Sequence, residues 1–509
     1  MVITVKEMRV IETNCVGLGI PLRMLMEAAG ASVARVVEER ISPNGAGRVV
    51  VLAGKGGNGG DALVAARYLS GRGYSVTVVP AYPFEQVEHP DARANLEILK
   101  RLDTVEFTKP GDTSVLQDAG VIIDGLLGTG VKGELREPIR SLVEEANRSR
   151  ARLRVAIDTP TGLNPDTGEI HGVAFKADVT VTFHDVKPGL LKKKDIAGEI
   201  VVANIGVPRD AIIYAGPGDV IHRIPQKPLD AHKGVGGRIL VVGGSIEYTG
   251  APALVAAAAL AAGADLAFLA VPASVRSIIA SYTPEIITYP VGGEYFKKDD
   301  LPKIVNIIEK TRPHVVVVGN GIGREEDTLE FVRELIKFLI EKNIPMVIDA
   351  DGLKAFKVGS ISFKWTTVLT PHRGEYKSLT GETLPTDTNR AIERLMEASK
   401  RLEATILLKA PIDMIVMGEK YKLNKTGNPG MSIGGTGDVL AGIVAAFLAR
   451  TRDPFVAAYT AAYINGLAGD YLVSIKKEIP SPTRIVEILP LILSSPLETH
   501  LETYIRSGA

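Results

Sequence analysis

The chain has 509 residues, and its 59 Lys and Arg balance its 59 Asp and Glu, so the formal net charge is zero. At roughly 100–200 residues per domain, this length predicts two or three domains, each large enough to bury its own core. Charge neutrality argues against nucleic acid or an anionic membrane as a partner, because both attract basic proteins over long distances. The single cysteine, Cys15, excludes an internal disulfide, and without an N-terminal apolar stretch we expect a cytoplasmic protein.

In the first half of the chain, short apolar runs alternate with segments of helical period. The runs lack the alternation of half-buried strands, which indicates a mostly parallel sheet covered on both faces. We expect helices over Leu22–Arg40, Asp61–Arg72, Ala92–Leu102 and Ile139–Ser149, and strands over Val49–Ala53, Ser75–Pro80, Val121–Asp124, Arg154–Asp158, Val179–Phe183 and Ile200–Ala203. This unit is predicted to be a Rossmann-like, doubly wound α/β domain.

From Tyr214 to Gly237 the pattern gives way to proline, glycine and polar residues, which is typical of a linker or a covering segment. A second α/β pattern then runs to the C-terminus. Its expected strands are Ile239–Val242, Leu266–Val271, Val315–Val318, Pro345–Asp349, Thr367–Leu369 and Thr405–Lys409. We therefore predict a first domain over 1–215, a linker over 216–229 and a second domain over 230–509.

Residues 251–273 are apolar enough to raise the question of a membrane span. The stretch is mostly alanine and contains Pro252, Asp265 and Pro272. A charge near the centre of a span costs about 2.5–3.5 kcal/mol, and alanine offsets little of that cost. We expect a buried helix over 252–262 followed by a strand instead.

A glycine-rich turn, GKGGNGGD, follows the first strand and opens a helix. Gly54, Gly56 and Gly59 match G-x-G-x-x-G, in which glycines let the backbone approach a phosphate at a helix N-terminus. The motif alone is weak, because the acidic residue expected after the next strand is missing and no Lys-Ser/Thr follows. A tight strand–helix turn without a ligand is the alternative.

Two further strands of the first domain end in aspartate, Asp124 and Asp158. Loops at the carboxyl ends of parallel strands meet at one edge of the sheet, so Asn58, Asp124 and Thr161 should converge there. An amide, a carboxylate and a hydroxyl suit a weakly held cation rather than zinc, and Asp158 remains as a candidate general acid or base. A strand-end aspartate is equally often a helix cap or turn residue.

The motifs GKGGNGGDAL, DGLLGTGVKGELREP and AIDTPTGLNPDTG resemble the N-terminal epimerase domain of NAD(P)H-hydrate repair enzymes. The resemblance covers about residues 1–215. It implies that Asn58, Asp124 and Thr161 hold potassium and that Asp158 binds the hydrate at the reacting ring. It also implies hydrate contacts by Gly57, Asn58, Gly59, Gly60, Asp61, Gly128, Thr129, Gly130, Val131, Lys132, Gly133 and Glu134. The family usually has a second asparagine at Gly57 and a serine at Thr161.

In the second half, the motif NPGMSIGGTGD precedes the apolar helix expected over Val439–Ala449. Glycine-rich backbone at a helix N-terminus forms an anion hole, and Asp438 stands beside it as a base. A carboxylate next to a phosphate site is what an alcohol needs when it attacks a phosphoryl group. Strand-end segments around Asn320, Asp349 and His372 support this site, although His372 alone would be a hydrogen-bonded loop residue.

The motif GGTGD occurs throughout ribokinase-like folds, and the whole set of motifs over about 230–470 resembles ADP/ATP-dependent NAD(P)H-hydrate dehydratases. This implies a ribokinase-like α/β second domain. The implied hydrate contacts are Ala251, Gly323, Thr370, Pro371, His372, Arg373, Gly374, Glu375, Tyr376 and Asp438. The implied adenine-nucleotide contacts are Lys409, Ala410, Pro411, Ile412, Asp413, Asn428, Pro429, Gly430, Met431, Ser432, Ile433, Gly434, Gly435, Thr436 and Gly437. Ala410 departs from the family's usual glycine.

Together the resemblances imply a bifunctional enzyme that epimerises R- and S-NAD(P)H-hydrate and dehydrates the S epimer with ADP or ATP, with Mg²⁺ at the phosphates and potassium at the epimerase site. A homo-oligomer is expected. The sequence does not decide whether the enzyme prefers ADP or ATP, or whether it prefers NADH-hydrate or NADPH-hydrate. One alternative is a ribokinase-like kinase of a small alcohol such as a hydroxymethylpyrimidine. Another is that the first domain is only a nucleotide-binding regulatory domain.

Overall fold

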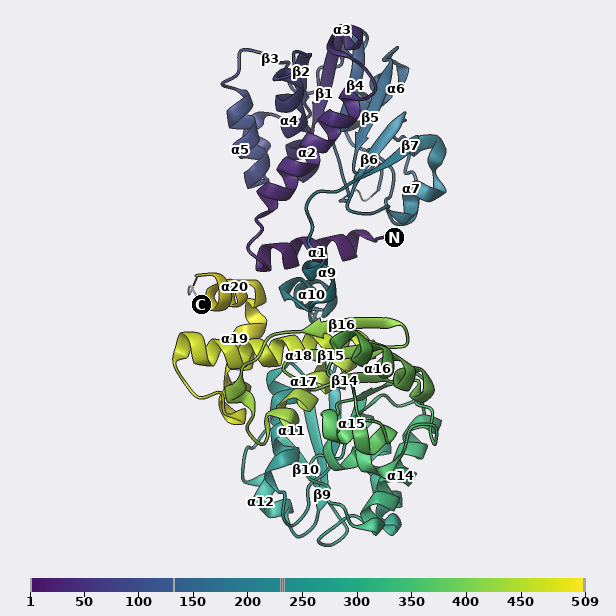
Figure 1. Cartoon of the computed structure of the whole chain (residues 1–509), viewed down its shortest axis with the longest axis vertical. Coiled ribbons are helices and arrows are strands. Elements are labelled where there is room, and N and C mark those ends of the chain that lie inside the picture. The colour runs from purple at the N-terminus through teal and green to yellow at the C-terminus, as the bar shows by residue number, and fades with distance from the viewer. Residues whose placement is uncertain (1, 131–132, 229, 231, 233, 507–509) are drawn as a thin grey trace. The chain divides into compact units, whose positions relative to one another are not determined.

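The computed structural model describes residues 2–130, 133–228, 230, 232 and 234–506. The chain forms two compact units, residues 1–208 and residues 209–509 (Figure 1). Each unit contains its own sheet, so each builds its own core. The segment expected to be a linker, 216–229, lies in the second unit and contains the helix α10 (Pro217–Arg223). The predicted domain bounds stay a prediction, because they divide the chain by activity, whereas the two units are defined by contacts within each unit.

The first unit contains a parallel sheet in the order β3-β2-β1-β4-β5-β6-β7. Its central strands are runs of branched apolar residues buried on both faces, as expected for a sheet between two helical layers. The strands are β1 (Arg48–Ala53), β2 (Ser75–Pro80), β3 (Val105–Phe107), β4 (Ala119–Gly125), β5 (Leu153–Ile157), β6 (Val179–Phe183) and β7 (Glu199–Ala203).

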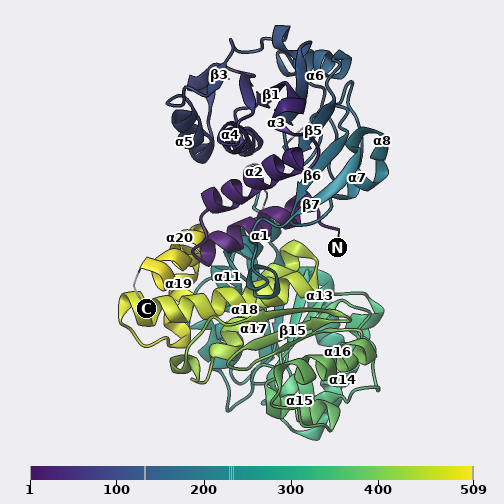
Figure 2. The same ribbon diagram turned by 45° about the horizontal axis from the view of Figure 1, so that its top comes forward.

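Helices cover both faces of this sheet (Figure 2). On one face, α6 packs its apolar side chains against Val50, Leu52 and Ile122. Elsewhere in the unit α2 and α4 pack so closely that a Cβ at Gly30 would lie 2.4 Å from the Val64 side chain. The helices are α1 (Val5–Gly17), α2 (Leu22–Glu38), α3 (Pro43–Ala46), α4 (Gly57–Ser70), α5 (Pro90–Leu99), α6 (Ile139–Arg148), α7 (Pro188–Lys192) and α8 (Lys194–Ala197).

The second unit contains a larger sheet in the order β10-β9-β8-β11-β12-β13-β14-β15-β16. Its strands are parallel from β10 to β14, and β14, β15 and β16 continue antiparallel. The strands are β8 (Arg238–Val242), β9 (Leu266–Pro272), β10 (Ile286–Val291), β11 (Val315–Val318), β12 (Met346–Ile348), β13 (Thr367–Leu369), β14 (Thr405–Leu408), β15 (Asp413–Met417) and β16 (Lys420–Asn424).

Successive residues of β8 enter two different cores, as the pleat of a strand requires. Ile239 and Val241 pack with α11, α17, α18 and α19, whereas Leu240 and Val242 pack with α13, α14, α15 and α16. The helices are α9 (Asp210–Ile213), α10, α11 (Gly250–Ala261), α12 (Arg276–Ala280), α13 (Leu301–Thr311), α14 (Glu326–Glu341), α15 (Arg373–Thr380), α16 (Thr388–Leu402), α17 (Thr436–Thr451), α18 (Pro454–Tyr471), α19 (Pro482–Ser494) and α20 (Pro496–Leu501).

The structure confirms the predicted two-domain α/β class and the mostly parallel sheets. The alanine-rich stretch forms α11 and β9, as expected, and among the described residues none of the helices has the length and apolar character needed to cross a membrane. The sequence analysis missed α1, β3, β10 and the hairpin of β15 and β16.

Candidate functional site

In the first unit, glycines shape the turn between β1 and α4. A Cβ at Gly59 would lie 2.0 Å from the carbonyl oxygen of Gly54, and a Cβ at Gly54 would lie 1.8 Å from that of Leu126. Larger residues are therefore excluded, and the turn presses against the loop after β4. Gly56 has open space where a side chain would be. That side of the turn, at the N-terminus of α4, is accessible to a ligand.

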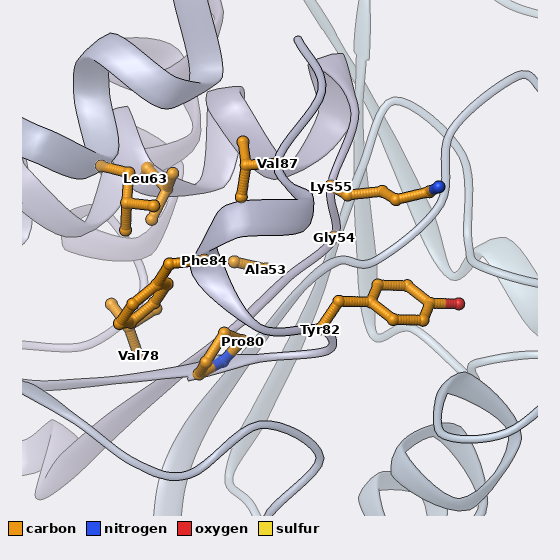
Figure 3. Close-up of a pocket in the computed structure, with 10 residues that line it drawn as sticks. Ala53, Gly54, Lys55, Leu63, Val78, Pro80, Tyr82, Phe84 and Val87 are labelled. Carbon is orange, nitrogen blue, oxygen red and sulfur yellow. The ribbon is translucent and has the colours of Figure 1, made fainter.

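Beside this turn lies a small hollow lined mostly by apolar residues, which Figure 3 draws as sticks. Its volume is about 10 Å³, which is about the space of one water molecule. Lys55 and Tyr82 extend together away from the side where Leu63 and Phe84 lie. The hollow is too small to hold a nucleotide, so the turn itself is the candidate contact surface.

Asp124, near the end of β4, is fully buried and hydrogen-bonded to Thr161, a residue that was expected to lie close to it. The Thr161 backbone N–H donates to Asp124 Oδ2 at 2.8 Å, and the Thr161 hydroxyl donates to Oδ1 at 2.7 Å. Burial raises the pKa of Asp124 to about 6, although the bonds from Thr161 and Leu126 lower it. No ion pair of Asp124 occurs within the described part of the chain, so its negative charge lacks a compensating positive group.

Asn58 lies against the same loop that contacts Thr161. A Cβ at Gly128 would lie 3.3 Å from the Asn58 Cβ, and the Leu127 N–H donates to the Thr161 hydroxyl at 3.0 Å. Asn58 Nδ2 is buried and has no hydrogen-bond partner among the described residues. An unsatisfied amide near a buried, uncompensated carboxylate fits a monovalent cation with oxygen ligands, since the amide oxygen and nitrogen can be exchanged by rotation.

Asp158 follows β5 with a φ of +59°, a left-handed conformation that costs free energy outside glycine. Its Oδ1 accepts hydrogen bonds from the Thr182 hydroxyl and the Phe183 N–H, both at 3.2 Å, and from the ammonium of Lys187. Lys187 has no solvent exposure and also donates to the Phe183 carbonyl at 3.0 Å. A buried ammonium requires a negative partner, and Asp158 supplies it.

The sequence analysis did not identify Lys187, although its position in a loop after a strand's carboxyl end was a usable signal. Two other carboxyl groups interact with Asp158. Burial raises the pKa of Asp61 well above its usual value, and Asp158 and Glu12 raise it further. Burial and Asp158 likewise raise the pKa of Glu12 to about 7. Asp61 was a predicted hydrate contact, whereas Glu12 was not predicted.

The remaining predicted contacts of this unit lie on the turn at the start of α4 and on the loop after β4. Gly57 begins α4, and Gly59 and Gly60 follow in its first turn. In the loop after β4, Gly130, Gly133 and Glu134 are exposed, while Gly128 and Thr129 are half-buried. Val131 and Lys132, which were predicted to contact the hydrate, lie outside the described residues.

In the second unit, Asp438 lies in the first turn of α17, beside the predicted glycine-rich segment. Gly435 precedes the helix with a φ of +101°, and a Cβ there would lie 2.9 Å from the Leu254 and Pro482 side chains. Gly434 has nothing within 4 Å of an added Cβ. The N–H groups of this helix N-terminus thus face accessible space, which suits an anion.

A chain of buried polar groups connects Asp438 to Lys409. Asn320 donates through Nδ2 to Asp438 Oδ1 at 2.7 Å and to Asp349 Oδ2 at 3.0 Å. Lys409 donates to Asp349 Oδ1 at 2.9 Å and lies 3.8 Å from Glu375 Oε2. Burial raises the pKa of Asp438 to about 6, and Asp349 adds to this effect. Burial lowers the pKa of Lys409, but Asp349, Glu375 and Asp438 together raise it above its usual value.

Two of these groups, Asp438 and Glu375, line a cavity of about 710 Å³, which is large enough for a nucleotide-sized ligand. Seven predicted residues line it: Ala251, His372, Gly374, Glu375, Gly434, Gly435 and Asp438. Eleven other lining residues were not among the predicted contacts, and Tyr248, Arg324, Asp351 and Lys354 are four of them. Arg324 and Lys354 both pair with Asp351. The cavity therefore carries cationic groups as well as the carboxylate of Asp438.

Some of the residues predicted to contact the hydrate in this unit are buried or cap a helix. Tyr376 is 1% exposed and donates to the Arg394 carbonyl at 3.3 Å, and Thr370 is also buried. Their side chains lie in the core, so any ligand contact would come from backbone atoms. His372 is the N-cap of α15 and accepts from the Gly374 N–H at 2.9 Å. Thus His372 is the hydrogen-bonded loop residue of the alternative interpretation, and it also lines the cavity.

Two loops hold the residues predicted to contact the adenine nucleotide. The first loop follows β14, and its Ala410 N–H donates at 3.0 Å to Asp413 at the start of β15, which also accepts from Asn424 Nδ2 at 3.0 Å. The second loop precedes α17, where the Thr436 hydroxyl donates to the carbonyls of Met431 and Ile433 at 2.9 Å. Both loops are thus held by their own side chains before any ligand binds.

Asp470 of α18 also holds the second loop in place. It accepts hydrogen bonds from the Gly427 N–H and from Asn428 Nδ2, both at 2.8 Å. The hydroxyl of Tyr504, in the helical turn Glu502–Arg506, donates to the same carboxylate. The predicted nucleotide loop is therefore connected to the last helical turns through one aspartate.

The fold and these two sites define a two-domain α/β protein in which each unit places carboxyl groups beside a glycine-rich helix N-terminus. The family model described as YjeF-related protein N-terminus matches residues 22–189, and the model described as NAD(P)H-hydrate dehydratase matches 239–491. The chain is 43% identical to the bifunctional NAD(P)H-hydrate repair enzyme Nnr of Hyperthermus butylicus, over 97% of this chain and 93% of that protein.

It is 44% identical to the bifunctional NAD(P)H-hydrate repair enzyme Nnr of Pyrobaculum aerophilum, over 92% of this chain and 93% of that protein. Among solved structures, the ADP/ATP-dependent NAD(P)H-hydrate dehydratase of Bacillus subtilis is similar at 23% identity and a TM-score of 0.49, covering 56% of this chain and 98% of that one. The chain belongs to the family of bifunctional NAD(P)H-hydrate repair enzymes.

Proposed function

We propose that this protein repairs hydrated nicotinamide nucleotides at two separate centres. The first unit interconverts R- and S-NAD(P)H-hydrate, and the second unit dehydrates the S epimer to NAD(P)H at the expense of ADP or ATP. The observation that carries the second activity is Asp438, held by Asn320 at the N-terminus of α17 and facing a cavity of about 710 Å³. Family membership supports the pairing of the two activities in one chain.

The chemistry explains why a dehydratase uses a phosphoryl donor. The hydrate carries a hydroxyl on C6 of the nicotinamide ring, and hydroxide is a poor leaving group. Asp438 accepts the hydroxyl proton while the oxygen attacks the terminal phosphorus of the nucleotide, whose bond to the bridging oxygen breaks so that AMP leaves from ADP, or ADP from ATP. The C6–O bond then breaks with both electrons on the departing phosphate, assisted by the lone pair of the ring nitrogen. Loss of a proton from C5 restores the C5–C6 double bond.

The nucleotide and the hydrate are assigned to the predicted residues of this unit. Lys409–Asp413 and Asn428–Gly437 hold ADP or ATP, with Mg²⁺ at its phosphates, and Ala251, Gly323 and Thr370–Tyr376 contact the hydrate. Two features support this assignment: the open backbone at Gly434, and the ammonium of Lys409, which lies 3.5 Å from where a Gly437 Cβ would be. A fixed positive charge beside a helix N-terminus favours phosphate oxygens.

In the first unit, potassium is assigned to Asn58, Asp124 and Thr161, and the hydrate to Gly57–Asp61, Gly128–Glu134 and Asp158. The fully buried Asp124 and the unsatisfied amide of Asn58 support the cation, which would neutralise the carboxylate beside the nucleotide turn. Bound there, potassium supplies positive charge near the phosphates. A cytoplasmic location and a homo-oligomeric state stay predictions.

The family finding favours this function over the small-alcohol kinase. The two are separated by incubating the protein with mixed hydrate epimers, with and without ADP, and following the return of NAD(P)H absorbance. We expect absorbance to recover fully with ADP, and only epimer interconversion without it. Accumulation of a stable phosphorylated product would instead favour the kinase. Recovery of only the S fraction would remove the epimerase assignment.

A further inference from the structure

The helix α1 presents a carboxyl group on its buried face. Met8, Ile11 and Cys15 are at most 7% exposed, and positions 8, 11, 12 and 15 share one side of a helix. Glu12 therefore points in the same direction as these apolar side chains. Burying a carboxyl group in such a position costs free energy unless the group is paired or hydrogen-bonded.

Contacts at its start hold α1 against the loop that carries Lys187. The Ile3 N–H donates to the Val186 carbonyl at 2.9 Å, and Val2 forms a bridge with the same residue. The Val5 N–H donates to Asp166 Oδ1 at 3.0 Å, in the segment that follows Asp158. Two attachments thus direct the inner face of α1 towards the carboxyl ends of β5 and β6.

Glu12 faces charged groups from three other segments of the unit. Asp158 after β5 raises its pKa, whereas Lys187 after β6 and Arg9 of its own helix lower it. Asp61 of α4 and Cys15 also interact with its charge. Glu12 nevertheless makes no side-chain hydrogen bond or ion pair with another described residue, so none of these groups explains why the carboxyl is there.

Asp158 has one oxygen committed and one oxygen free. Its bonds from Thr182, Phe183 and Lys187 all go to Oδ1. Oδ2 has no partner among the described residues, and the side chain keeps 14% of its exposure. Lys187 thus acts as a positioning residue that fixes the orientation of the Asp158 side chain through Oδ1 and leaves Oδ2 free for a ligand or a water molecule.

We propose that Glu12 is a second catalytic residue of the first centre and acts on the nicotinamide ring from the face opposite Asp158. The inference rests on the proposed epimerase function and adds to it. Inversion at a carbon requires the oxygen to leave from one face and return on the other. Two carboxyl groups from different elements, one unpaired and one held by a lysine, are suited to serve the two faces.

The step balances with water as the co-reactant. Protonated Glu12 gives its proton to the C6 hydroxyl, and the C6–O bond breaks with both electrons leaving on water, while the nitrogen lone pair forms a C6–N1 double bond. A second water attacks C6 from the other face and loses a proton to Asp158 Oδ2, and the π electrons return to nitrogen. The reverse reaction exchanges the two roles, and the hydroxyl oxygen of the product comes from solvent.

The test measures epimer interconversion without ADP, in the full-length protein. We expect Glu12→Gln to slow interconversion by about 10²-fold or more, a typical loss for a positioned acid. Dehydration of purified S epimer with ADP should be unchanged. Glu12→Asp, which keeps a carboxyl one methylene shorter, should retain intermediate activity. Glu39→Gln, at an exposed position after α2, is the matched control and should behave as wild type.

Two further readouts separate catalysis from a structural role. The wild-type rate should decline above a pH of about 7, where Glu12 loses its proton, and Glu12→Gln should lack this limb. In ¹⁸O-water, each enzymatic inversion should place solvent oxygen on C6. Retention of the original oxygen, or a Glu12→Gln rate within twofold of wild type, overturns the inference while the epimerase function stands. A wild-type protein without interconversion overturns both.

Discussion

Replacing Asp438 by asparagine removes the proposed base while preserving the shape of the site. With a pKa of about 6, the ionised form of Asp438 outnumbers the protonated form by roughly 30 to 1 at pH 7.5. Nearly every molecule therefore has a competent base. Asparagine offers the same Oδ1 to Asn320, whose Nδ2 lies 2.7 Å away, but it cannot accept the hydroxyl proton. Losing a positioned base costs about 10²–10⁴ in rate.

We therefore expect Asp438→Asn to lower ADP-dependent dehydration of S-hydrate at least about 10²-fold. ADP affinity should change little or increase, because one negative charge beside the phosphates disappears. Epimer interconversion should continue at the wild-type rate, since no residue is shared between the centres. The assay combines NADH absorbance with calorimetric ADP titration and epimer separation.

The matched control is Asp453, which also begins a helix but lies outside the cavity. It accepts hydrogen bonds from the N–H groups of Phe455 and Val456 as the N-cap of α18. Asp453→Ala should lower the free energy of unfolding by about 0.5–2 kcal/mol and leave turnover intact. If Asp438→Asn behaved in this way, with full turnover and reduced stability, the dehydratase mechanism and the kinase alternative would both be refuted.

Three further outcomes are expected. Asp158→Asn should abolish epimer interconversion and leave purified S epimer repairable with ADP; interconversion at the wild-type rate would remove Asp158 from the mechanism. Asp124→Ala should weaken the first centre and remove its potassium dependence, and anomalous scattering that shows no ion between Asn58 and Asp124 in the wild type would contradict the cation assignment. Dehydration should slow as the pH falls through about 6, because the raised pKa of Asp438 makes its base form disappear there; a flat rate profile from pH 8 to 5 would show that another group accepts the proton.

The inner strands could be predicted because burial on both faces leaves an uninterrupted run of branched apolar residues. β10 and β16 lack that mark: Ile287 is 41% exposed at the sheet edge, and β16 carries lysines. β15 does contain a short apolar run over residues 414–417. The start of α1 did carry a readable sign, since Thr4 and Glu7 form a capping box.

For the site, aspartates after strands could be predicted because parallel topology brings those ends together. Residues that reach the site from other elements, or that only their burial distinguishes, could not be predicted. Glu12 comes from a helix whose orientation depends on backbone bonds to Val186, and Lys187 looks like any other lysine until its burial is known. Asn320 and Asp349 lay in recognised segments, but only the structure shows that they connect Asp438 with Lys409.

Because Asp470 accepts hydrogen bonds from both Asn428 and Tyr504, binding of a nucleotide to the loop proposed to hold it would be thermodynamically linked to the anchoring of the last helical turns. Such coupling is reciprocal. If the contact of Asp470 with Tyr504 increases the affinity for a nucleotide, then a bound nucleotide stabilises the turn Glu502–Arg506 against local opening by the same free energy. Amide hydrogens in those last turns would then exchange more slowly in the bound protein, although residues 502–506 are not among those that line the cavity.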